Sequence, residues 1–117
     1  MYPTEIKLHQ ARRILEVSFD DGSTFQLPCE YLRVFSPSAE VRGHRPGQET
    51  LVIGKEQVNI KAIEPIGRYA VKLVFDDGHD SGLYSWNVLH ELAIKHAENW
   101  QDYLRRLAET AYKRAAG

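Results

Sequence analysis

The chain has 117 residues, of which 43% are hydrophobic and 26% charged, and its formal net charge is −1. These values describe one globular domain that needs neither a disulfide nor a metal to bury a core. The near-neutral charge argues against a general nucleic-acid binder, and the lone Cys29 excludes an internal disulfide and a multi-thiolate metal site. No apolar run reaches the roughly 20 residues of a membrane span and no signal-peptide pattern opens the chain, so we expect a cytoplasmic protein.

Strand, turn, strand and helix patterns follow one another in the first 35 residues. Alternating apolar side chains predict a short strand over residues 6–8 and a second over Ile14–Phe19. Asp21-Gly22 then predicts a tight turn, because this dipeptide tolerates the positive φ that hairpin turns need. Residues 25–27 are the expected return strand, and a short helix is expected to begin at Pro28. The expected buried face of that helix consists of Tyr31, Leu32 and Phe35.

A similar order returns in the second half of the chain. Ala70–Phe75 is predicted as a strand, followed by a turn and by a return strand over residues 83–84 that leads into a helix near Ser85. The tetrapeptide Phe-Asp-Asp-Gly occurs in both places, beginning at Phe19 and at Phe75. The sequence Asp-Asp-Gly is common in turns, so the tetrapeptide alone does not indicate a repeat. Because the strands and the helix around it also match, we predict that one strand–hairpin–helix unit is used twice.

A loop and a further hairpin are expected between these two units. Residues 36–50 are rich in Pro, Gly, Ser and charge, and loops of about 15 residues are usually functional or disordered. Residues 51–53 and 58–63 are predicted to pair as a hairpin, with Pro65 and Gly67 separating it from the next strand.

Two helices are predicted in the last third of the chain. Ser85 is the expected N-cap of the first helix, and Asn99 is the expected N-cap of the second, with Asp102 at its third position. The apolar stripe of the second helix consists of Trp100, Tyr103, Leu104, Leu107, Ala108, Ala111 and Tyr112. We expect this stripe to pack on the domain's own sheet; the alternative is a groove-binding or dimer-forming helix.

The whole pattern predicts one α+β domain over residues 1–117. It consists of small, mostly antiparallel sheets built from hairpins, a short central helix and C-terminal helices, with residues 98–117 as a helical extension.

Two segments of the chain resemble a known family. They read LPCEYLRVFSPSAEVRGH, from Leu27 to His44, and YAVKLVFDDGHDSGLYSWNVLHEL, from Tyr69 to Leu92. The chain is similar to the domain at the N-terminus of gamma-butyrobetaine hydroxylase and trimethyllysine hydroxylase, and most of all to its stand-alone bacterial form, a domain of unknown function (DUF971). The resemblance extends to about Glu98 and is most specific at Leu32-Arg33 and at Asp77-Gly78-His79. The same domain also occurs fused to Mrp-type iron–sulfur scaffold ATPases.

The domain of the hydroxylases that this chain resembles binds a structural zinc through three cysteines and one histidine. The cysteines follow a Leu-Arg pair with Cys-x-Cys-x-x-Cys spacing, which places them at Ser36, Ser38 and Val41 of this chain, and the histidine at His79. Structural zinc takes about four Cys or His ligands, and neither a serine hydroxyl nor valine replaces a thiolate. We therefore expect the zinc site to be lost and no cofactor to be present.

His79 remains the strongest candidate for a site residue. Its neighbours Asp76, Asp77 and Asp80 are expected to raise its pKa toward a protonation switch. One interpretation makes His79 a residual metal ligand with His44 as the second, since two histidines and a carboxylate suit a divalent ion. The other interpretation, which we favour, is that His79 forms hydrogen bonds that hold the hairpin loop.

Two further features are each open to a functional or a structural interpretation. The central region is locally basic through Arg33, Arg42, His44, Arg45 and Lys55, which suits a phosphate or an acidic partner, or else a solvated loop. Cys29 stands near a helix start, where a thiolate can be stabilised, but an inert, partly buried thiol is the default.

No catalytic motif is recognisable. The hydroxylases carry their iron on a separate domain with a His-x-Asp pair, whereas His79-Asp80-Ser81 lacks that spacing, and the chain has neither a P-loop nor a nucleophile elbow. We predict a non-catalytic interaction or accessory domain with a separate protein partner, for which the fused forms suggest an oxygenase or an iron–sulfur scaffold protein. The alternatives are an accessory factor in iron or iron–sulfur protein metabolism, and a small metal-binding protein associated with an oxidoreductase.

Overall fold

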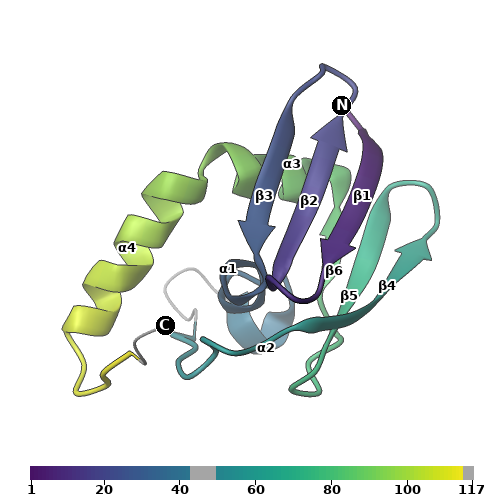
Figure 1. Ribbon diagram of the computed structural model, residues 1–117. Coiled ribbons are helices and arrows are strands. Elements are labelled where there is room, and N and C mark those ends of the chain that lie inside the picture. Colours follow the sequence, from purple (N-terminus) through teal and green to yellow (C-terminus); the bar gives the residue numbers. More distant parts are fainter. Residues whose placement is uncertain (43–49, 115–117) are drawn as a thin grey trace.

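The computed structural model describes residues 1–42 and 50–114 (Figure 1). Its strands are β1 (Pro3–His9), β2 (Ile14–Phe19), β3 (Thr24–Pro28), β4 (Ile60–Ile66), β5 (Ala70–Phe75) and β6 (Leu83–Ser85). Its helices are α1 (Cys29–Val34), α2 (Ala39–Arg42), α3 (Trp86–Ile94) and α4 (His96–Ala108). None of the helices in this part of the chain is long and apolar enough to cross a membrane.

The six strands form two antiparallel sheets, β1-β2-β3 and β4-β5-β6. This arrangement confirms the predicted α+β class and its hairpin-built sheets. The central strands β2 and β5 share one burial pattern, in which every second residue is buried, because successive side chains of a strand point to opposite faces. The buried residues are Leu15, Val17 and Phe19 of β2 and Val71, Leu73 and Phe75 of β5.

One hydrophobic core lies where both sheets meet α1 and α3 (Figure 1). The helices contribute Tyr31 and Leu32 of α1 and Leu89 of α3, all of which are fully buried. Ser85 caps α3 as predicted, since its side chain accepts a hydrogen bond from the Val88 N–H at 3.1 Å.

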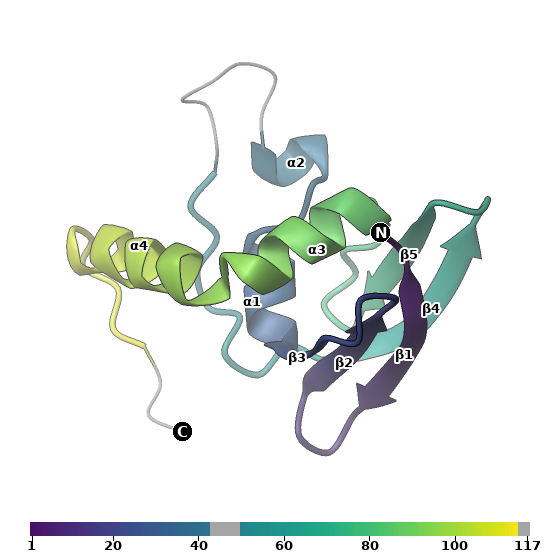
Figure 2. The same ribbon diagram turned by 90° about the horizontal axis from the view of Figure 1, so that it is seen from above.

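The helix α4 projects away from the sheets, as Figure 2 shows from above. Its apolar stripe packs within the domain, but not on a sheet as predicted. Tyr103 and Leu107 contact Val34 at the end of α1, together with Leu51 and Val52. The stripe prediction was also too long, because α4 ends at Ala108.

The two Phe-Asp-Asp-Gly copies occupy equivalent hairpin turns, as predicted. Gly22 has a φ of +88° and Gly78 a φ of +91°, a left-handed conformation that glycine adopts without the steric penalty of a side chain. In both turns the Phe carbonyl accepts the glycine N–H, and the Phe N–H donates to the carbonyl of the residue after the glycine. That residue is Ser23 in the first turn and His79 in the second.

The likeness between the halves extends beyond the predicted unit. The strands β1 and β4 each have seven residues, and each pairs with the Phe of its own half, through Pro3 and Ile60. In both strand pairs the pairing register then shifts in the same way: Glu5 pairs with Ser18, and Ala62 pairs with Val74, so one residue of the outer strand is skipped. The repeated unit is therefore β–β–β–α, and the sequence pattern revealed only its last three elements.

Residues 51–53 do not form the predicted hairpin with residues 58–63. No strand begins between Thr50 and Asn59; β4 starts at Ile60 and pairs with β5 instead. Pro65, which was expected to end the strand, lies inside β4 opposite Val71. A proline is tolerated there because β4 is an edge strand and needs no N–H on its outer side. The expected long loop over residues 36–50 is interrupted by α2.

The predicted N-cap at Asn99 is also wrong. The helix α4 begins at His96, directly after Lys95, and Asn99 lies within its first turn. The Asn99 side chain instead donates a hydrogen bond to the Tyr31 hydroxyl at 3.0 Å, which ties α4 to α1. Tyr31 in turn donates to the Leu92 carbonyl of α3 at 2.6 Å.

Candidate functional site

The segment after α1, the helix α2 and the loop between β5 and β6 bring polar side chains around His79. We call Ser36, Ser38, Glu40, His79 and Ser81 the His79 cluster. Ser36 is fully buried, and Ser38 and His79 are each 6% exposed. Buried polar groups of this kind are stable only when they are hydrogen-bonded.

Both ring nitrogens of His79 have a partner in this cluster. Nε2 lies 2.8 Å from Ser36 Oγ, and Nδ1 lies 3.2 Å from a carboxylate oxygen of Glu40. Ionised Glu40 only accepts, so Nδ1 carries the proton and donates to it. In a neutral ring Nε2 is then the acceptor and takes the Ser36 hydroxyl hydrogen, which fixes both the tautomer and the rotamer of Ser36.

The serines complete a closed ring of hydrogen bonds that runs from His79 through Ser36, Ser38 and Glu40 back to His79. Ser36 Oγ accepts the Ser38 N–H at 3.2 Å, and Ser38 Oγ accepts the Glu40 N–H at 3.2 Å. The hydroxyls of Ser38 and Ser81 lie 2.7 Å apart. The chain segment that carries Ser36 and Ser38 is thereby fastened to the loop that carries His79 and Ser81.

The pKa of His79 is lowered, not raised as the flanking acids led us to expect. Burial of the ring is the largest cause, and the charge of Arg33 adds to it, while Glu40 acts in the opposite direction. The carboxylates of Asp76 and Asp77 accept the backbone N–H groups of Asn59 and His79 rather than the ring. The ring is therefore neutral near pH 7.

The cluster does not fit a zinc ion. Two atoms that ligate a tetrahedral zinc at 2.0–2.3 Å lie roughly 3.3–3.7 Å apart, whereas His79 Nε2 and Ser36 Oγ are 2.8 Å apart, in direct hydrogen-bond contact. Val41 is buried and offers no ligand atom. Among the residues that the structure describes, no group of three His, Cys, Asp or Glu side chains suits a metal. His44, the expected second ligand, lies outside the described residues, as does Arg45.

Gly82 is a residue of this site that sequence reasoning missed. A Cβ at this position would overlap Ser36 Oγ and would approach Tyr84 Cε1 to 3.2 Å. The backbone of Gly82 therefore takes the space that any side chain would need, and this close approach lets Ser36 reach His79. In the sequence, the only indication of this role was a glycine three residues after the histidine.

A second group of charges lies beside the cluster. Arg33 Nε and Lys55 Nζ both contact the same oxygen of Asp77, at 2.8 and 2.6 Å. Although burial acts in the opposite direction, the hydrogen bonds from Lys55, the His79 N–H and Arg33 lower the pKa of Asp77 to about 2. Two of the predicted basic residues are thus neutralised within the protein. Cys29 is fully buried, and burial raises the pKa of its thiol to about 11, which favours the inert thiol over a stabilised thiolate.

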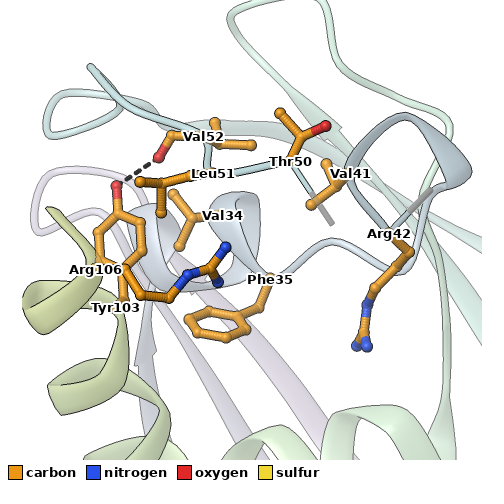
Figure 3. Close-up of a pocket in the computed structure, with 9 residues that line it drawn as sticks. All are labelled: Val34, Phe35, Val41, Arg42, Thr50, Leu51, Val52, Tyr103 and Arg106. Atoms are coloured by element: carbon orange, nitrogen blue, oxygen red, sulfur yellow. Dashed lines mark hydrogen bonds between the residues drawn. The ribbon is translucent and has the colours of Figure 1, made fainter. Parts of the chain in front are cut away.

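A small cavity of about 90 Å³ with apolar and polar walls lies between α1, α2, the segment from Thr50 to Val52, and α4. Figure 3 shows the Arg106 and Arg42 side chains on either side of the Phe35 ring, and the hydrogen bond of 2.6 Å that Tyr103 donates to the Val52 carbonyl. Arg42 was one of the predicted basic residues. Arg106 was not, because its proximity to Arg42 depends on the docking of α4.

The sequence comparison assigns residues 6–90 to the family described as "Gamma-butyrobetaine hydroxylase-like, N-terminal". The chain belongs to this family. Two solution NMR structures of similar proteins have the same fold, each with a TM-score of 0.80. One is 51% identical and the match covers 98% of this chain and 93% of that one; the other is 44% identical and the match covers 98% of each chain.

A crystal structure from Acidithiobacillus ferrooxidans is also similar to this chain. It is 38% identical with a TM-score of 0.66, and the match covers 78% of this chain and 91% of that chain. That protein is described as a member of the DUF971 family with unknown function. No functionally curated protein matches the chain. The resemblance noted in the sequence is thereby confirmed at the level of the family.

Proposed function

We propose that this protein is a non-catalytic accessory domain that works by binding another protein, and that it folds without the zinc that the hydroxylase resemblance implies. The observation that carries the proposal is the closed circuit of the His79 cluster. Both nitrogens of the ring and the Ser36 hydroxyl are engaged with groups of the protein itself. A general base or a metal ligand needs a free lone pair directed at a substrate or an ion, and this ring has none.

The network supplies what a structural zinc supplies elsewhere. It joins the segment after α1 to the β5–β6 loop by side-chain hydrogen bonds between residues 43 positions apart in sequence. The partner we propose is an oxygenase or an iron–sulfur scaffold protein, the two kinds of protein to which the family's domain is joined in fused forms.

Two measurements on the same protein test this proposal. Thermal unfolding should give the same melting temperature with and without a strong chelator, and metal analysis should find no stoichiometric ion. A photoreactive amino acid placed in turn at exposed positions, such as Tyr69 (75% exposed) and Ile94 (60% exposed), should form an adduct with one defined protein in cells.

Either measurement can overturn the proposal. A melting temperature that falls on chelation would show that an ion holds the fold together. The absence of a specific adduct from every surface position, with the partner proteins present, would show that the domain does not act by binding a protein.

A further inference from the structure

A second cavity continues the one beneath Arg42 and Arg106. It has a volume of about 170 Å³ and lies against α3, between Phe35, Arg42 and Leu92. Phe35 and Arg42 line both cavities. Together the cavities form a groove between the α1–α2 side and the α3–α4 side of the molecule, which we call the Phe35 groove.

The charges along this groove are unbalanced. Arg42 and Arg106 have no carboxylate partner among the residues that the structure describes. The other two charges of the groove, Glu91 and Lys95, form an ion pair with each other at 3.3 Å. The groove therefore presents two unneutralised guanidinium groups on either side of an aromatic ring (Figure 3).

Three other arginines of the described residues are neutralised, whereas Arg12, Arg13 and Arg68 have no carboxylate partner there but do not line this groove. Arg33 pairs with Asp77 and Arg114 with Glu30, and Arg105 pairs with Asp102 of α4 and with Glu109 directly after it. Planar guanidinium groups favour carboxylates, which they bind through two parallel hydrogen bonds. Two unpaired arginines that line one groove thus point to a ligand that carries carboxylates.

The size of the cavities narrows the kind of ligand. Pockets for cofactors and drug-sized molecules measure roughly 300–1,000 Å³, and each cavity of the groove is smaller. A space of about 90 Å³ lined by Val34, Leu51 and Val52 suits one aliphatic side chain. An apolar side chain flanked by acids is a feature of a peptide segment rather than of a free metabolite.

We propose that the Phe35 groove binds an acidic segment of a partner protein. One aliphatic side chain of that segment enters the cavity beside Phe35, and neighbouring carboxylates bind Arg42 and Arg106. This inference rests on the proposed function and specifies which surface and which partner chemistry it uses. A nucleic acid fits less well, because two free cations neutralise few phosphates and the chain has a net charge of −1.

A library of random dodecapeptides, selected on the immobilised intact protein, is the first probe. The enriched peptides should carry Leu, Ile or Val flanked by Asp or Glu. Titrated with a synthetic copy of one such peptide, the isotope-labelled protein should show amide shifts at Val34, Phe35, Leu51 and Val52. Enrichment of peptides without acidic residues, no enrichment, or shifts centred on Tyr69 and Trp86 would each overturn the proposal.

A pair of double variants provides the second test. R42A/R106A should weaken peptide binding by about 10-fold, because two ion pairs with solvent-accessible arginines are lost, and raised salt should remove the difference. The matched control R68A/R105A removes the same charge elsewhere and should bind as the wild type does. Circular dichroism and thermal melting check that both variants are folded. Equal binding by the wild type and R42A/R106A would refute the role of the arginines.

A single-stranded oligonucleotide with the same number of negative charges as the peptide completes the test. If the oligonucleotide bound more tightly than the peptide at equal salt, the ligand of the groove would be a nucleic acid and the peptide proposal would be wrong. The failure of this inference is separable from that of the proposed function. A cellular adduct at Tyr69 with no peptide binding in the groove would leave the interaction role intact and place it on another face.

Discussion

Removal of the His79 ring tests whether the cluster holds the fold together. In His79→Ala the fully buried Ser36 hydroxyl loses its acceptor and a cavity replaces a ring that is 6% exposed. An unsatisfied buried hydroxyl costs about 1–3 kcal/mol, and the cavity adds to this, so we expect a loss of about 2–4 kcal/mol. Ser36→Ala leaves Nε2 of the ring without its donor and should cost about 1–3 kcal/mol.

Urea unfolding followed by circular dichroism, with a chelator present, measures both losses. The double variant should lose less than the sum of the single variants, with a coupling energy of at least about 0.5 kcal/mol, because the two side chains share one hydrogen bond. Ser23, the half-buried equivalent of His79 in the first hairpin, provides the matched control, because its hydroxyl donates only to the exposed Asp21 carboxylate of the same turn. Ser23→Ala should change the free energy of unfolding by no more than about 0.5 kcal/mol.

Two results would refute this reasoning. Additive losses would show that the ring and the hydroxyl act independently. About one equivalent of a tightly held divalent ion in the wild type, absent from His79→Ala, would show that the histidine is a metal ligand after all.

Three further predictions follow from particular contacts. Gly82→Ala should cost about 1–3 kcal/mol in urea unfolding, because its Cβ overlaps Ser36 Oγ; wild-type stability would contradict the tight packing described above. Gly78→Ala and Gly22→Ala should each cost about 1 kcal/mol for their positive φ alone, since neither Cβ meets an atom within 4 Å, and clearly unequal losses would argue against equivalent turns. Asp77→Asn should lower stability by about 2 kcal/mol at pH 7 but little at pH 2: its pKa is depressed from 3.8 to about 2, so its contribution is present above pH 4 and lost as the pH falls through 2. A loss that is the same at both pH values would exclude the ionised carboxylate as its cause.

The pKa of His79 predicts a pH dependence of its own. The folded ring resists protonation, so between its lowered pKa and its ordinary value of 6.5 the unfolded chain binds more protons. Stability should therefore be full above pH 6.5 and decline as the pH falls below it. His79→Gln should reduce this decline in urea titrations between pH 7 and 5; the remainder is expected from His96, whose pKa is also lowered by burial. An unchanged slope would show that the ring does not titrate differently in the two states.

Local chemistry made much of the fold predictable. Asp21-Gly22 and Asp77-Gly78 form their turns because glycine alone adopts the required φ without strain, and Ser85 caps α3 through its own side chain. The alternating pattern of Ile14–Phe19 gave the strand and its buried face together.

Errors arose where the structure depends on residues far apart in the sequence. The residues of β4 were predicted to pair with residues 51–53, but they pair with β5. The alternating pattern of a strand predicts which of its faces is buried, and it does not specify which neighbouring strand it pairs with. The pKa of His79 moved in the unexpected direction because Arg33 and burial act through space, while the adjacent acids bind backbone N–H groups. The position of Arg106 beside Arg42 required the docking of α4 on α1, which no periodicity predicts.

The matching β–β–β–α halves have a consequence for how the chain is held together. Leu15 and Val17 of the first half share one core with Leu73 and Phe75 of the second, so neither half can cover its own apolar face. The chain between Arg42 and Thr50 joins the halves, and a cut there divides the protein into two peptides with complementary faces. Such peptides should reassociate without a covalent link, and a gene encoding one unit alone would yield a peptide that folds only as a pair.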